Sequence, residues 1–255
     1  MSAYTLPEPA PNWALFLDFD GTLVELQPHP DMVRPAPLLG ATLDRLAALL
    51  HGAVAIVSGR SLDDLDRFLN GTALPMAGVH GLERRDAEGA VHRPLDHTES
   101  FQAARATLAR FVAEHPGTHY EDKGNSLALH FRNAPGYAAQ AEAALRAECQ
   151  RMGEEFEVQR GKSVMELKPT GHHKGTVVAT FLEEPPFRGR VPVFIGDDVT
   201  DEDAFSVVVE RGGHAIRVGD LTATHATCRI GSVEEVLEWL TTVIRTLERS
   251  ATSTR

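Results

Sequence analysis

The chain has 255 residues, 42% of them hydrophobic, which suffices for one large domain or two smaller ones with packed cores. Its formal charge of −11 argues against a surface that binds nucleic acid or an anionic membrane. Two cysteines, and no stretch typical of a signal peptide or a membrane span, lead us to expect a cytoplasmic protein in a reducing compartment.

Continuous apolar runs end in small or polar residues at four places, namely 13–22, 53–60, 191–198 and, more weakly, 214–219. Such runs predict parallel strands that are buried on both faces. Apolar spacing over 36–52 and 61–71, the latter with Ser61 as N-cap, predicts helices that follow the first two strands. The alternation predicts an α/β fold whose chemistry collects beyond the carboxyl ends of the strands.

The middle of the chain has a different pattern. Two amphipathic helices are predicted at 100–117 and 136–153, each followed by two strands, of which SLALHFR and SVMELKP alternate imperfectly. We therefore expect an α+β cap domain at 88–171, inserted between two parts of a core domain at 1–87 and 172–255.

Five carboxylates crowd the end of the third apolar run: Asp197, Asp198, Asp201, Glu202 and Asp203. Capping by Thr200 explains the last three, because acidic side chains are favoured in the first turn of a helix. The first two sit at the strand end, where paired carboxylates need a proton or a cation. Hard oxygen ligands of this kind suit Mg²⁺.

A second carboxylate pair, Asp18 and Asp20 in DFDGT, ends the first predicted strand. Alone, this motif could be a strand-to-turn signal. Two pairs that end two strands favour instead a Mg²⁺ site that attracts phosphate. An aspartate there could serve as nucleophile and form an aspartyl-phosphate.

Four motifs, DFDGT, VSGR, the Lys174 of HHKG, and GDDVTDED, resemble in this order the motifs of haloacid-dehalogenase-like (HAD) phosphatases. The segments AGVHGLE, YEDKGNSLALHFR, GKSVMELKPTGHHKG and IGDDVTDEDAF resemble more narrowly the trehalose-6-phosphate phosphatases. The resemblance covers about residues 13–245. It implies a HAD-like Rossmannoid parallel-sheet core with an inserted α+β cap, and a Mg²⁺-dependent phosphatase for trehalose 6-phosphate.

The resemblance also implies catalytic roles. Asp18 would attack phosphorus, and Asp20 would protonate the departing sugar oxygen and then deprotonate water. Ser58 would donate a hydrogen bond to the phosphoryl group, which Lys174 would neutralise while keeping Asp18 ionised. Asp201 would orient Lys174.

For the metal, the resemblance implies a Mg²⁺ ion held by Asp18, Asp197 and the main-chain carbonyl of Asp20. Asp198 would bind the ion through water or order nearby groups.

Substrate-binding candidates come from the segments that resemble the narrower family: Glu83, Lys123, His130, Arg132 and Glu166. Sugar hydroxyls need such paired donors and acceptors. The alternatives are that Lys123 and Arg132 are solvated cations with Glu166 as their surface partner, that His130 is a hydrogen-bonded imidazole in a core, and that Glu83 shapes a turn.

Three other functions are compatible with these motifs. A phosphatase of the same fold could act on sucrose 6-phosphate or glucosylglycerol phosphate. A phosphomutase would use the same aspartate pair but return the phosphoryl group to the sugar, and a regulatory binder would need no catalysis. We expect a monomer whose partner is a small sugar phosphate.

Overall fold

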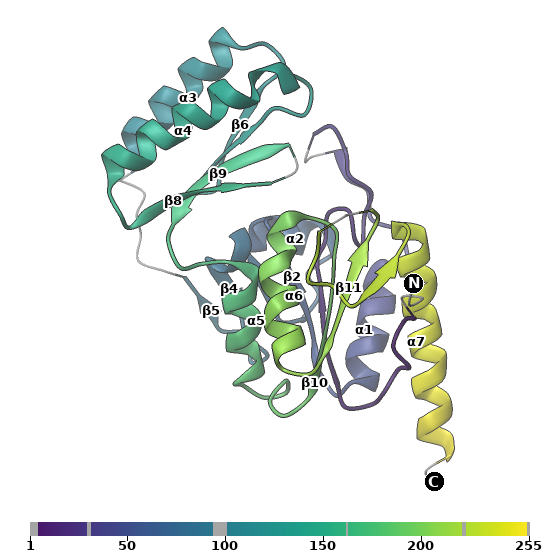
Figure 1. The fold of residues 1–255 in the computed structure, drawn as a ribbon. Coiled ribbons are helices and arrows are strands. Elements are labelled where there is room, and N and C mark those ends of the chain that lie inside the picture. Colours follow the sequence, from purple (N-terminus) through teal and green to yellow (C-terminus); the bar gives the residue numbers. More distant parts are fainter. Residues whose placement is uncertain (1–4, 30–31, 94–100, 162, 221–222, 254–255) are drawn as a thin grey trace. The chain divides into compact units, whose positions relative to one another are not determined.

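The structure is a computed structural model that describes residues 5–29, 32–93, 101–161, 163–220 and 223–253 (Figure 1). The chain forms two compact units, residues 1–92 with 173–255 and residues 93–172. The chain thus passes between the units at 92–93 and 172–173, compared with the predicted 87–88 and 171–172. We retain as a prediction that the units are separate domains.

The first unit is built on an eight-stranded sheet of order β12-β11-β10-β1-β2-β3-β4-β5. Its strands are β1 (Trp13–Leu17), β2 (Val54–Val57), β3 (Met76–Gly78), β4 (Glu83–Arg85), β5 (Val91–His92), β10 (Val191–Gly196), β11 (His214–Val218) and β12 (Cys228–Ile230). The strands from β12 to β3 run parallel, whereas β4 and β5 are antiparallel additions at one edge. The α/β class with a parallel core is therefore confirmed.

Helices cover both faces of this sheet. They are α1 (Leu39–Leu49), α2 (Leu62–Phe68), α5 (Lys174–Leu182), α6 (Glu202–Glu210) and α7 (Val233–Ser253). Alternate side chains of β1 point to opposite faces of the sheet. Leu15 packs in a core with α1, α2 and α7, and Phe16 packs in a core with α5 and α6. This two-sided burial explains why β1 is a continuous apolar run.

Ser61 caps α2 as predicted, because its Oγ accepts a hydrogen bond from the Asp64 N–H. Helix α7 was not predicted from the sequence, nor were the two- and three-residue strands β4, β5 and β12. None of the helices in the described ranges combines the length and the hydropathy that a bilayer-spanning segment needs.

The second unit has the predicted order of helix, two strands, helix and two strands. Its elements are α3 (Gln102–Glu114), β6 (His119–Asp122), β7 (Leu127–His130), α4 (Ala138–Met152), β8 (Phe156–Arg160) and β9 (Val164–Pro169). The strands form an antiparallel sheet of order β6-β7-β9-β8, and both helices pack on one face of it (Figure 1). Leu108 and Leu145, on the two helices, join a core with Leu129 and Leu167 on the strands.

Candidate active site

Three neighbouring strands of the first unit end in polar side chains. Strand β1 lies between β10 and β2 in the sheet. Asp18 directly follows β1, Asp197 directly follows β10, and Ser58 directly follows β2. Because the strands are parallel, their carboxyl ends share one edge of the sheet. The topology thus brings together residues that are far apart in the sequence, and all three are buried.

Lys174, the first residue of α5, reaches this edge from the helix layer. Its Nζ donates to Asp18 Oδ1 at 2.7 Å and to Asp201 Oδ1 at 2.6 Å. The start of α5 can approach α6 closely because residue 175 is glycine, where a Cβ atom would lie 2.5 Å from the Asp203 carbonyl oxygen. The three charged side chains are 5% exposed or less, so their interactions are weakly screened.

The negative charge in this cluster exceeds the positive charge. Asp18, Asp197 and Asp201 each place a carboxylate oxygen within 4.8 Å of the others. Burial raises the pKa of Asp18, Lys174 lowers it, and the Asp201 and Asp197 carboxylates raise it again, with a net pKa well above the usual value. Burial lowers the pKa of Lys174, but Asp18 and Asp201 outweigh it and keep the lysine protonated.

A divalent cation fits this charge imbalance and the donor set. Three clustered carboxylates offer the hard oxygen ligands that Mg²⁺ and Ca²⁺ prefer. The loop after β1 passes close to Asp197 at Gly21, whose φ is +82° and whose Cβ, if present, would lie 2.3 Å from the Asp197 carboxyl carbon. The glycine of the DFDGT motif therefore leaves room for this carboxylate.

Asp20, two residues after Asp18, has a different partner. The Arg60 guanidinium donates from Nε to Asp20 Oδ2 at 2.6 Å and from Nη2 to Oδ1 at 2.7 Å. Ser58 Oγ is buried and accepts a hydrogen bond from the Arg60 backbone N–H at 3.2 Å. Sequence reasoning did not single out Arg60, although it is the last residue of the quoted VSGR motif.

Asp198 begins a short 3₁₀ turn, Val199–Asp201, ahead of α6. Its Oδ1 accepts from the Val199 N–H at 2.7 Å, while Asp201 Oδ2 accepts from the Asp198 N–H at 2.8 Å. The prediction that Thr200 caps the helix was wrong, because the N-cap position of α6 is Asp201, and the side-chain capping is done by Asp198 at the turn ahead of it. Arg217, on β11, donates from Nη1 to the Asp198 carbonyl oxygen at 2.8 Å and so fixes the loop that carries Asp198.

The metal ligands predicted from the sequence thus lie in different surroundings. Asp18 and Asp197 meet in the carboxylate group, together with Asp201. Asp20 and Asp198 direct their carboxylates to Arg60 and to the Val199 N–H.

Glu83, a predicted substrate-binding residue, lies on β4 of the first unit. Its Oε2 accepts from the Leu62 N–H at 2.9 Å, at the start of α2. This contact joins the edge of the sheet to the segment that carries Arg60, and substrate binding by Glu83 stays a prediction.

Two of the predicted substrate-binding residues meet in the second unit. Lys123 Nζ lies 3.5 Å from Glu166 Oε1, which also accepts from Ser126 Oγ at 2.5 Å. Glu166 is 4% exposed. The alternative that made it the surface partner of solvated cations is therefore wrong.

His130 Nε2 lies 2.9 Å from Glu121 Oε2, across the β6–β7 pair, and Arg132 is exposed. Burial raises the pKa of Glu121, but the His130 hydrogen bond and the charge of Lys123 outweigh it, so the net pKa is lowered. Sequence reasoning missed Glu121, and the signal was its place in YEDKG, two residues before Lys123.

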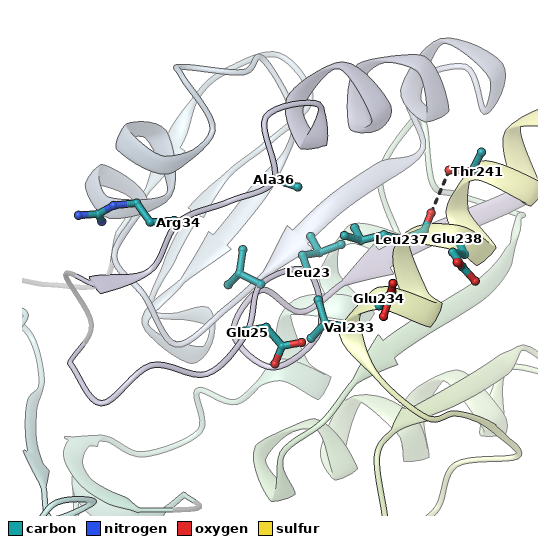
Figure 2. A pocket seen from close by; sticks show the side chains of 10 residues that line it. Leu23, Glu25, Arg34, Ala36, Val233, Glu234, Leu237, Glu238 and Thr241 are labelled. Atoms are coloured by element: carbon teal, nitrogen blue, oxygen red, sulfur yellow. Dashed lines mark hydrogen bonds between the residues drawn. The ribbon is translucent and has the colours of Figure 1, made fainter.

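The first unit also carries a cavity of about 490 Å³ beside the segment that follows the DFDGT motif (Figure 2). Its lining comes from that segment and from the start of α7: Leu23, Val24, Glu25, Arg34, Ala36, Val233, Glu234, Leu237, Glu238 and Thr241. Of these described lining residues, none is a predicted site residue.

Comparisons with known proteins show to which family the chain belongs. The family described as trehalose-phosphatase matches residues 16–251. A probable trehalose-phosphate phosphatase of Sinorhizobium fredii is 44% identical over 224 residues, covering 88% of this chain and 84% of that protein. Trehalose-6-phosphate phosphatase of Escherichia coli is 40% identical over 252 residues, covering 98% and 93%.

Among solved structures, the C-terminal domain of C. albicans trehalose-6-phosphate phosphatase has a TM-score of 0.80. Its sequence identity is 22%, and the match covers 91% of this chain and 92% of that one. A likeness at this identity shows that the two chains share a fold.

Proposed function

Because the chain belongs to the trehalose-phosphatase family, we propose that it hydrolyses trehalose 6-phosphate to trehalose and inorganic phosphate. Family membership makes it a phosphoric monoester hydrolase of the HAD superfamily. The observation that best supports the mechanism is the buried contact between Asp18 and Lys174 at the end of β1.

Asp18 is the proposed nucleophile. Lys174 holds its Oδ1, and we assign the attack to Oδ2, which accepts a long hydrogen bond from Thr22 at 3.3 Å. As the Asp18 oxygen bonds to phosphorus, the bond between phosphorus and the sugar oxygen breaks. The protonated lysine stabilises the charge on the transferring group, as fixed cations do in phosphoryl transfer.

Asp20 is the proposed acid and base. It gives its proton to the departing sugar oxygen, and the carboxylate that results then takes a proton from the water that opens the aspartyl-phosphate. Asp201 positions Lys174 through its 2.6 Å contact, and Ser58 is assigned to a phosphoryl oxygen.

We assign the cation site to Mg²⁺, held by the carboxylates of Asp18 and Asp197 and by the Asp20 carbonyl. Asp198, which caps the adjoining turn, is assigned to the ion through water. When bound, the ion supplies positive charge that polarises the phosphoryl group and offsets the carboxylates. Its charge also favours the ionised form of Asp18, which the nucleophilic role requires.

Specificity is assigned to the second unit. Glu166 and Lys123 form a buried pair that can accept from and donate to sugar hydroxyls, and His130 and Arg132 lie on or beside β7. We add Glu121 to this set because it bonds His130. We further propose that the enzyme is a cytoplasmic monomer.

The test compares phosphate release from trehalose 6-phosphate, sucrose 6-phosphate and glucose 6-phosphate, each with Mg²⁺ and with excess EDTA. We expect rapid release from trehalose 6-phosphate alone, and its loss in EDTA. Faster release from sucrose 6-phosphate would move the substrate assignment to the alternative. Formation of an isomerised sugar phosphate in place of free phosphate would indicate a phosphomutase.

A further inference from the structure

Arg60 and Asp20 form a two-pronged ion pair between the loops that follow adjacent strands. The donor-to-acceptor distances are 2.6 Å for Nε to Oδ2 and 2.7 Å for Nη2 to Oδ1. The Arg60 side chain is 10% exposed and that of Asp20 29%. The arginine end of the pair is thus the more enclosed, and the carboxylate lies nearer the solvent.

The guanidinium has contacts besides those with Asp20. Its central carbon lies 4.7 Å from the centre of the Phe68 ring and 5.8 Å from that of Phe19. The Arg60 backbone is fixed as well, since its carbonyl accepts from the Val79 N–H at 2.8 Å and its N–H donates to Ser58 Oγ. These contacts limit the movement of the guanidinium, so its two bonds to Asp20 fix the orientation of the carboxylate.

This orientation has a chemical consequence. A carboxylate offers about four lone-pair sites, and the fork occupies one on each oxygen, so the remaining sites of Asp20 are those directed away from Arg60. A guanidinium can fix both oxygens of a carboxylate, whereas a lysine ammonium acts as a single point.

We propose that Arg60 is a positioning residue, which holds the Asp20 carboxyl in the orientation from which its proton passes to the departing oxygen. The inference rests on the proposed function, in which Asp20 is the proton donor. In that step the phosphorus–oxygen bond breaks, its electron pair stays on the sugar oxygen, and this oxygen takes the proton from Asp20. Arg60 itself exchanges no proton and acts only through Asp20.

The test uses esters that differ in their need for a proton. Benzyl phosphate and p-nitrophenyl phosphate both present one aromatic ring and lack sugar hydroxyls. Benzyl phosphate has an alkoxide leaving group, which needs protonation, as the sugar oxygen of trehalose 6-phosphate does. The nitrophenolate of p-nitrophenyl phosphate leaves without a proton. The ratio of kcat/KM on the two esters therefore reports on proton donation, because kcat/KM covers the steps up to departure of the leaving group.

For Arg60→Gln we expect kcat/KM to fall by about 10²-fold on benzyl phosphate and trehalose 6-phosphate, but by no more than about 3-fold on p-nitrophenyl phosphate. Arg60→Lys keeps the charge but not the fork, so it should show the same selective loss, with a thermal midpoint close to the parental one. The Arg60→Lys variant therefore serves for the test if Arg60→Gln folds poorly.

Arg67→Gln is the matched control. Arg67 lies on α2, its guanidinium carbon is 5.1 Å from the same Phe68 ring, and it pairs with Asp64 at 2.7 Å. It has the same chemical type and aromatic neighbour but does not bind Asp20, so all three esters should keep kcat/KM within about 2-fold, as expected for an exposed ion pair.

A double-mutant cycle tests whether Arg60 acts through Asp20. Once Asp20→Asn has removed the proton donor, adding Arg60→Gln should lower kcat/KM on benzyl phosphate by less than about 3-fold. A loss in that background as large as in the parent, or equal losses on benzyl phosphate and p-nitrophenyl phosphate, would overturn the inference. A parental protein that releases phosphate from trehalose 6-phosphate in the same experiment keeps the proposed function intact, so the two failures are distinguishable.

Discussion

Lys174 Nζ lies 2.7 Å from Asp18 Oδ1, although the two residues are 156 positions apart in the chain. The contact joins the first residue of α5 to the end of β1, and the same ammonium also bonds Asp201. One cation thus holds two buried carboxylates, and its loss should affect both chemistry and stability.

Lys174→Met is expected to abolish most activity. Without the ammonium, the phosphoryl group loses a fixed cation, and kcat on p-nitrophenyl phosphate should fall by about 10²–10³-fold. Two buried carboxylates also lose their partner, which should lower the free energy of unfolding by about 3 kcal/mol or more. Steady-state kinetics and urea unfolding measure the two effects.

Lys168→Met is the control for the loss of a buried lysine. Lys168 lies on β9 with its side chain 1% exposed and 3.3 Å from Glu157, within the second unit. It should lose stability while the folded protein keeps kcat on the aryl ester. Equal losses of kcat in both variants would contradict the role given to Lys174.

Asp197→Asn and Asp203→Asn test which acidic residues bind the cation and which stabilise the start of α6. Asp197 belongs to the buried carboxylate group, so its variant should need far more Mg²⁺ for half-maximal activity. Asp203 lies in the first turn of α6 with its side chain 50% exposed, so its variant should lose about 0.5–1 kcal/mol of helix stability and keep its Mg²⁺ requirement. Titrating Mg²⁺ against activity separates them, and equal shifts would mean that the ligands are misassigned.

Gly21→Ala should impair the cation site through steric contact with Asp197. The new Cβ would lie 2.3 Å from the carboxyl carbon, at a φ of +82° that disfavours alanine by about 1–2 kcal/mol. Gly89→Ala is the matched control, since its φ is +85° and the described structure places no atom within 4 Å of the new Cβ. Both variants should lose stability, but only Gly21→Ala should raise the Mg²⁺ requirement. Parental Mg²⁺ dependence in Gly21→Ala would count against the site.

Glu166→Ala should change specificity. Loss of a buried polar anchor should lower kcat/KM on trehalose 6-phosphate by about 10²-fold, with a slight effect on p-nitrophenyl phosphate, which lacks sugar hydroxyls. Glu157→Ala, at a site with a 43% exposed side chain on β8, serves as the control and should leave both esters unaffected. Equal losses on both esters in Glu166→Ala would assign the residue to the fold instead.

The sequence predicted the parts of the fold that depend on local pattern. Continuous apolar runs revealed β1, β2 and β10, because strands buried on both faces need apolar residues throughout. The edge strands β5 and β12 escaped notice because two or three residues cannot show a periodic pattern. α7 escaped notice although its amphipathic pattern is present in the sequence.

The candidate site was predictable as a set of residues but not as a set of partners. Motif order brought Asp18, Lys174 and Asp197 to attention, whereas the pairing of Asp20 with Arg60 depends on loops from two adjacent strands. The capping by Asp198 also followed from tertiary context, since Asp201, the other half of the capping box, is held by Lys174. Local spacing carries no information about such contacts.

The most direct test of the central claim is to trap the phosphoryl group on the protein. Enzyme is mixed with trehalose 6-phosphate carrying ³²P, quenched in acid within milliseconds, digested and mapped. The account predicts a label on the peptide that contains Asp18, formed before free phosphate appears and absent from Asp18→Asn. Phosphate release by Asp18→Asn at the parental rate, or a label on another residue, would contradict it.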